Sequence, residues 1–170
     1  MTIRDEGAAA PEPSGGRKRR ILVLGYGNPG RQDDGLGPAA VAEIERMALP
    51  GVIAHDNYQL VIEDAVEVAE ADAVWFVDAA KTGAEPYEIH RLAPANDIAF
   101  SSHEVKPEVI LALARRYCGK APEAWLLGIR GYEFEFTEQL TGRAQENLRQ
   151  AVAVLVNAVA AGLDGGQAAA

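Results

Sequence analysis

Short runs of hydrophobic residues alternate along this chain with segments in which hydrophobic positions recur every three or four residues. The short runs predict β-strands at 21–27, 52–57, 72–78, 87–92 and 124–130. The three-to-four repeats predict amphipathic helices at 36–49, 62–71, 107–117 and 142–163. Such alternation is typical of an α/β fold. We expect a three-layer sandwich in which helices cover both faces of a mostly parallel five-stranded sheet.

Two details refine this expectation. The link 79–86 is too short for a crossover helix, so the strand at 87–92 should run antiparallel to the strand before it. The last helix places Leu148, Val152, Leu155, Val159 and Leu163 on one stripe, which we expect to lie in the core.

Both ends of the chain lack the periodicity of the middle. Residues 1–20 are rich in Gly, Ala and Pro and close on a basic run, and we expect a disordered tail there. Residues 164–170 should form a second, frayed tail. We expect the remaining 21–163 to make one domain, because a chain of this length buries roughly 70 % of its unfolded surface. Such a domain is stable without disulfides or a structural metal ion.

Charge and cysteine content exclude several classes of function. The 16 basic and 25 acidic residues give a net charge of −9, which argues against a general nucleic-acid binder. The single cysteine, Cys118, excludes an intramolecular disulfide and suits a reducing compartment. The sequence contains neither a 20-residue apolar span nor a signal-peptide pattern, so we expect a cytoplasmic protein with no membrane partner.

The turn after the first predicted strand carries the most informative motif. Residues 25–30 read GYGNPG and fit the G-x-G-x-x-G pattern of dinucleotide-binding proteins. Asp33 and Asp34 follow where a phosphate would sit, so charge repulsion opposes a nucleotide there. The same six residues also resemble the opening of peptidyl-tRNA hydrolases, but that family places an Arg-His-Asn segment soon afterwards. This chain has no histidine before His55.

A longer stretch resembles another family. Residues 21–37 read ILVLGYGNPGRQDDGLG, and this is similar to the signature of the nickel-iron hydrogenase maturation endopeptidases. The resemblance continues through 77–79 (VDA), 101–104 (SSHE) and 128–134 (GIRGYEF), and covers most of 21–159. Several separated motifs in the right order are more specific than one glycine turn.

The resemblance implies a site and a substrate. In that family the second acid of the pair, an aspartate after the third strand and a histidine in a later loop interact with a metal; the matching residues here are Asp34, Asp78 and His103. Two carboxylates and an imidazole suit nickel or zinc. The resemblance implies that the nickel arrives inside the substrate, the precursor of a hydrogenase large subunit whose C-terminal extension is removed. Asp33 or Asp34 is then the candidate proton acceptor. We expect the protein to be a monomer.

Each of these residues also has a simpler interpretation. Asp34 can cap the first helix, Asp78 can end a strand, and His103 can precede a helix that Ser102 caps. Asp33 can support the turn or lie on its surface.

Four further residues are candidates for substrate contact. Asn28 and Gly35 shape the glycine turn that aims the acids, and Arg130 and Tyr132 follow the last strand. The aromatic residues of 130–136 can instead pack in the core, because exposed and buried aromatics are not distinguished by sequence alone.

The other nucleophiles and histidines fit structural roles better. His55 and His90 fall in or beside predicted strands. Cys118 falls at a helix C-terminus, where the helix dipole disfavours a thiolate. No serine lies in a G-x-S-x-G elbow. The sequence therefore favours a peptidase of the hydrogenase maturation type, and the alternative it leaves open is a non-catalytic chaperone that senses the nickel site.

Overall fold

The computed structural model of the protein describes residues 19–97 and 105–163. The predicted tails fall almost entirely outside these ranges. Near the start of the described part, the side chain of Arg19 pairs with Glu123, and the backbone N–H of Arg20 donates to Asp72 at 2.9 Å. The domain bounds 21–163 stay a prediction.

All nine predicted elements are found in the described part of the chain. The strands are β1 (Ile21–Tyr26), β2 (Val52–Asn57), β3 (Ala73–Ala80), β4 (Tyr87–Leu92) and β5 (Glu123–Arg130). The helices are α1 (Leu36–Met47), α2 (Asp64–Glu70), α3 (Pro107–Cys118) and α4 (Gly142–Leu163), and a short 3-10 helix, η1 (Gln32–Gly35), precedes α1. The observed ends differ from the predicted ones by at most two residues.

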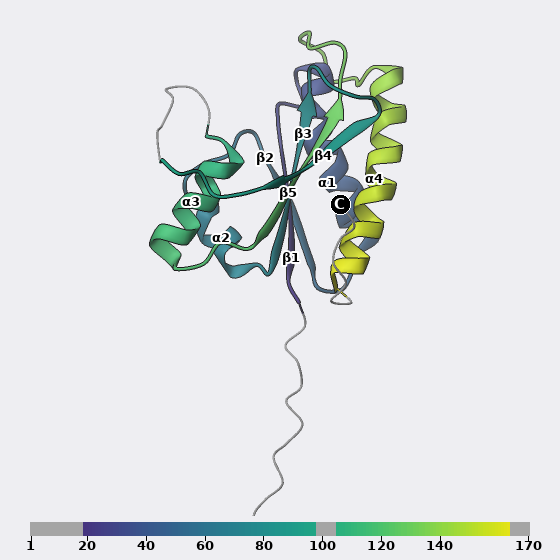
Figure 1. The fold of residues 1–170 in the computed structure, drawn as a ribbon. Coiled ribbons are helices and arrows are strands. Elements are labelled where there is room, and N and C mark those ends of the chain that lie inside the picture. The colour runs from purple at the N-terminus through teal and green to yellow at the C-terminus, as the bar shows by residue number, and fades with distance from the viewer. Residues whose placement is uncertain (1–18, 98–104, 164–170) are drawn as a thin grey trace, which may run out of the picture.

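The strands form one sheet in the order β2-β1-β3-β5-β4 (Figure 1). β1, β2, β3 and β5 are parallel, and β4 is antiparallel to β5. β4 therefore runs opposite to β3, as the short link between them predicted. β5 lies between β3 and β4, so the strand that follows β3 along the chain is not its neighbour in the sheet. The expected fold class is confirmed.

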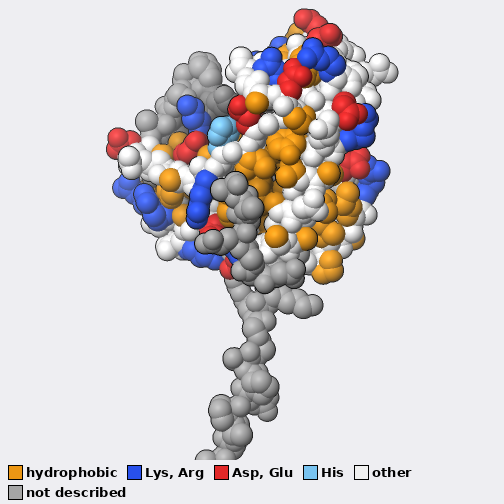
Figure 2. Space-filling model, turned by 45° about the vertical axis from the view of Figure 1, so that its right-hand side comes forward, with side chains coloured by type: hydrophobic (Ala, Val, Ile, Leu, Met, Phe, Trp, Pro, Cys, Tyr) orange, Lys and Arg blue, Asp and Glu red, His pale blue; other side chains and the backbone are white. Residues whose placement is uncertain are grey.

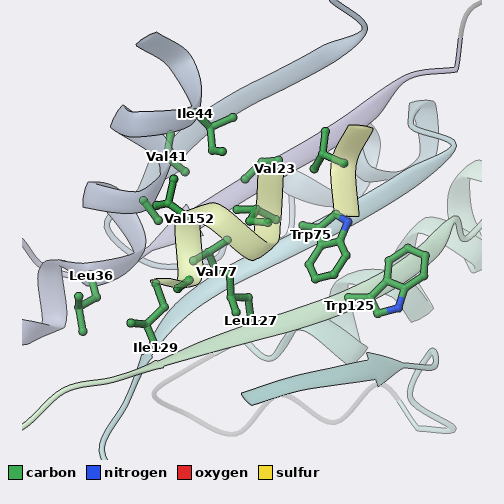
Figure 3. Close-up of a cluster of buried hydrophobic side chains, with 14 of the residues drawn as sticks. Val23, Leu36, Val41, Ile44, Trp75, Val77, Trp125, Leu127, Ile129 and Val152 are labelled. Atoms are coloured by element: carbon green, nitrogen blue, oxygen red, sulfur yellow. The ribbon is translucent and has the colours of Figure 1, made fainter. Parts of the chain in front are cut away.

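Helices cover both faces of the sheet, with α2 and α3 on one side and α1 and α4 on the other (Figure 1). Under α1 and α4 lies a cluster that includes the stacked rings of Trp75 and Trp125, 5.2 Å apart on adjacent strands (Figure 3). Of the predicted α4 stripe, Val152, Leu155 and Val159 are buried and Leu148 packs against them; the side chain of Leu163 lies outside the described part.

The strand order creates a switch point beside β1. From β1 the chain connects first to β2 on one side and then to β3 on the other. The segments that leave β1 and β3 therefore diverge above the carboxyl ends of these strands, which is where open α/β sheets form their binding sites.

Candidate active site

The glycine turn folds back on the acid pair that follows it. Gly27 has φ +137°, and a Cβ there would lie 2.0 Å from the carbonyl oxygen of Asp34, so any other residue would clash. Asn28 tightens the turn, because its Oδ1 accepts a hydrogen bond from the N–H of Gly30 at 2.8 Å. The motif thus fixes the position of Asp34 relative to the end of β1.

Asp34 is partly exposed, and its carboxylate accepts the backbone N–H of Asn28 at 2.9 Å. It does not cap α1: the N-cap is Gly35, and no side chain bonds the first turn. The capping interpretation is therefore wrong. The same bond argues against a nucleotide, because a carboxylate already occupies an amide of the turn that would have to face phosphate.

Asp33 points the opposite way and is fully buried. Its Oδ2 accepts the N–H of Tyr132 at 2.8 Å and of Glu133 at 3.2 Å, and the hydroxyl of Thr141 at 2.8 Å. Its Oδ1 accepts the N–H of Thr141 at 2.7 Å. Both oxygens hold the segment 131–141, so the surface interpretation of Asp33 is wrong and the geometry favours a supporting role over proton transfer.

Asp78 lies near the carboxyl end of β3, and one of its oxygens accepts the N–H of Ala79 at 2.7 Å. Its side chain is partly exposed, in contrast to the five buried residues that precede it in the strand. Because side chains alternate along a strand, Asp78 is on the same face as Phe76, toward α2 and α3.

Asp34 and Asp78 line one cavity of about 520 Å³ above β1 and β3. Its other walls come from the glycine turn, from the segment after β2, from the end of β3 and from a residue two positions before α3. They are Tyr26, Gly27, Asn28, Arg31, Tyr58, Gln59, Leu60, Ala79, Lys81 and Val105. The structure thus brings together two carboxylates that lie 44 residues apart in the sequence.

The third predicted member of this site, His103, lies outside the described residues. Within 19–97 and 105–163, no three His, Cys, Asp or Glu side chains are grouped so that they could hold a metal ion. Asp34 and Asp78 offer oxygen ligands, which suit a divalent cation. The metal role of Asp34, Asp78 and His103 stays a prediction.

The four candidate substrate-binding residues separate into two groups. Asn28 lines the cavity, and Gly35 is buried against Pro29, where it shapes the turn. Arg130 and Tyr132 are not among the residues that line the cavity. The Tyr132 ring packs against the core under α4, and its hydroxyl accepts a hydrogen bond from Asn147 at 2.8 Å.

The remaining histidines and the cysteine lie away from the cavity lining. His55 on β2 faces Glu67 on α2 at 3.3 Å, and His90 faces Glu88 on its own strand at the same distance. Cys118 is exposed at the end of α3.

Sequence reasoning missed Arg31 and Lys81, which line the cavity beside the carboxylates. It also missed Tyr58, which is 66 % exposed at the same cavity. Arg31 directly follows the glycine motif 25–30, and Lys81 lies three residues after Asp78. Their nearness to these motifs was the sequence signal that could have identified them.

Known proteins similar to this chain are found both by sequence and by structure. No family model matches the chain. A protein of Methanocaldococcus jannaschii, to which the name hydrogenase maturation protease is provisionally given, is 26 % identical over 139 residues, covering 76 % of this chain and 88 % of the relative.

Solved structures agree with the sequence match. A hydrogenase 2 maturation peptidase from a Thaumarchaeota archaeon is 26 % identical, with a TM-score of 0.64 over 84 % of this chain and 99 % of that chain. The hydrogenase maturating endopeptidase HybD of Escherichia coli shares the fold, with a TM-score of 0.66, 22 % identity and coverage of 87 % and 95 %. In sequence and in fold, therefore, the chain is similar to hydrogenase maturation proteases.

Proposed function

We propose that the protein is an endopeptidase that removes the C-terminal extension of a nickel-loaded hydrogenase large-subunit precursor. The observation that carries the proposal is the convergence of Asp34 and Asp78 on one cavity at the switch point of the sheet. Each carboxylate comes from a separate motif of the family resemblance, and the fold places both where a substrate can reach them.

The two carboxylates are suited to recognise a metal site presented by a partner. Oxygen ligands from Asp34 and Asp78 can complete the coordination of a divalent ion whose other ligands belong to the substrate. His103 is the proposed third ligand on the basis of the resemblance. Docking then depends on nickel. A precursor without nickel would leave the negative charges of Asp34 and Asp78 uncompensated in the interface.

Peptide hydrolysis also requires a group that takes a proton from the attacking water and returns one to the leaving amine. A carboxylate beside the scissile bond can do both. Asp34 is the stronger candidate, since its side chain is held by the N–H of Asn28 and still lines the cavity. Asp33 supports this arrangement from behind, because both its oxygens are occupied by the segment 131–141.

The location of the protein follows from the same proposal. A maturation protease must meet its precursor where nickel is inserted, which we propose is the cytoplasm. Among the described residues, no helix combines the length and the hydropathy needed to cross a bilayer.

A processing assay tests the proposal. Purified precursor, with and without nickel, is incubated with the protein, and shortening of the large subunit is followed on a gel. We expect cleavage only of the nickel-loaded form, loss of cleavage in Asp34→Asn, and full cleavage in Asp56→Asn, which alters an exposed acid on β2 outside the cavity. Binding of the loaded precursor without any shortening would instead identify a chaperone.

A further inference from the structure

Among the described residues, two cations at the cavity have no carboxylate partner, whereas most of the other described cations have one. Arg31 and Lys81 are both exposed and line the cavity beside Asp34 and Asp78. Among the described residues, neither forms an ion pair. The cations that do pair with a carboxylate are Arg19, Arg20, Arg46, Arg91, Lys120, Arg143 and Arg149.

Aromatic rings hold these two cations instead. The guanidinium carbon of Arg31 lies 5.0 Å from the centre of the Phe136 ring, and Nζ of Lys81 lies 5.1 Å from the centre of the Phe134 ring. Arg31 also donates a hydrogen bond to the carbonyl of Phe134 at 3.4 Å. Stacking on a ring orients a cation but leaves N–H groups at its edge free for an anion.

The segment that carries these rings is anchored through its backbone at both ends, while the Phe136 side chain is exposed. Phe134 and Phe136 belong to the segment 131–141, which the buried carboxylate of Asp33 holds through four hydrogen bonds. This segment lies at the upper end of the molecule (Figure 1), where Figure 2 shows basic and acidic side chains gathered above a hydrophobic area. The backbone on which the two cations rest is therefore held in place by Asp33.

We infer that Arg31 and Lys81 form a subsite that binds a carboxylate side chain of the substrate polypeptide close to the scissile bond. The inference rests on the proposed function. In a protein of net charge −9, a local pair of cations with no carboxylate partner among the described residues can attract an acidic segment to this edge. An arginine fork with free N–H groups matches carboxylate geometry.

The exposure of Arg31 and Lys81 indicates that they act in substrate binding and not in the chemical step. Donors that stabilise an oxyanion act in a water-excluded site, where their field is strong. Arg31 and Lys81 are exposed, so water and salt screen them, and charges at such a rim govern binding and its salt dependence. The two cations therefore act on KM and leave kcat nearly unchanged.

The test uses nickel-loaded precursor with the wild-type protein and the Arg31→Met/Lys81→Met double variant. We expect KM to rise at least tenfold with kcat within about twofold, and the difference to shrink as salt is raised. Lys81→Arg should stay close to wild type. The control is Arg115→Met, which removes an exposed cation of α3 that has no carboxylate partner among the described residues and does not line this cavity.

A second arm locates the carboxylate. Acidic residues of the precursor near the cleavage point are replaced one at a time by their amides. One replacement should raise KM for the wild type and have no further effect on the double variant. An unchanged KM in the double variant, a fall in kcat alone, or additive effects for every amide would overturn the subsite.

Failure of the proposed function gives a different result. If the wild type does not cleave the precursor at all, the peptidase proposal falls. The subsite is then judged by the dissociation constant of the loaded precursor, measured by surface plasmon resonance with the same variants. Tenfold weaker binding by the double variant supports it, and equal binding refutes it.

Discussion

Replacing Asp33 separates a supporting carboxylate from a reacting one. Its side chain is fully buried and accepts four hydrogen bonds, three at Oδ2 and one at Oδ1. In Asp33→Asn one of these positions becomes an NH2 group that faces a donor. If the amide oxygen takes the Oδ2 position, the NH2 group opposes the backbone N–H of Thr141.

The cost can be worked out from these contacts. A buried donor left without a partner costs about 1–3 kcal/mol, and hydrogen bonds to a charged group are stronger than neutral ones. We therefore expect Asp33→Asn to lower the free energy of unfolding by about 2–3 kcal/mol. At about 2–4 °C per kcal/mol for a domain of this size, Tm should fall by about 4–12 °C.

Urea unfolding and a thermal scan measure this change, with Asp56→Asn as the matched control on an exposed acid. Hydrogen exchange adds a local readout, because the amides of Tyr132, Glu133 and Thr141 should lose protection first. A stability within about 0.5 kcal/mol of wild type would refute the supporting role. Normal stability combined with lost processing would make Asp33 a reacting group.

Three further outcomes follow from the site. Asp34→Asn keeps an oxygen that can accept the Asn28 N–H, so it should change stability by under about 1 kcal/mol while processing falls at least about 100-fold in a gel assay; a large loss of stability would point to packing instead. Gly27→Ala combines φ +137° with a 2.0 Å approach to the Asp34 carbonyl, and should cost more than about 3 kcal/mol in urea unfolding; a neutral result would contradict the turn geometry. The free protein should bind nickel weakly and reversibly by calorimetry, since the ion comes with the substrate; a tight stoichiometric ion would contradict that source.

The helices and strands could be predicted well because each has a hydrophobic pattern within its own stretch of sequence. The buried strand 73–77 is a continuous hydrophobic run, and α4 repeats its core positions over 22 residues. The insertion of β5 between β3 and β4 was not predicted. Strand order depends on which edges pair after folding, and no local pattern records it.

In the candidate site, too, residues with a local sequence signal could be predicted, and arrangements that form only on folding could not. Asp34 and Asp78 stood out because each follows a recognisable run. The opposite orientations of Asp33 and Asp34 were not predictable, because adjacent acids look alike until the 3-10 turn separates their side chains. Arg31 and Lys81 resembled any solvated cation, and their partners Phe136 and Phe134 lie 105 and 53 residues further along the chain.

The central claim is that Asp34 and Asp78 act as one unit on the substrate. Its most direct test is a double-mutant cycle on the rate of precursor shortening with nickel-loaded precursor. Asp34→Asn, Asp78→Asn and the combined variant should all lose about the same large factor, because removing either member disables the pair. If either single variant processes the precursor at the wild-type rate, or the two losses simply multiply, the shared site at the ends of β1 and β3 is contradicted.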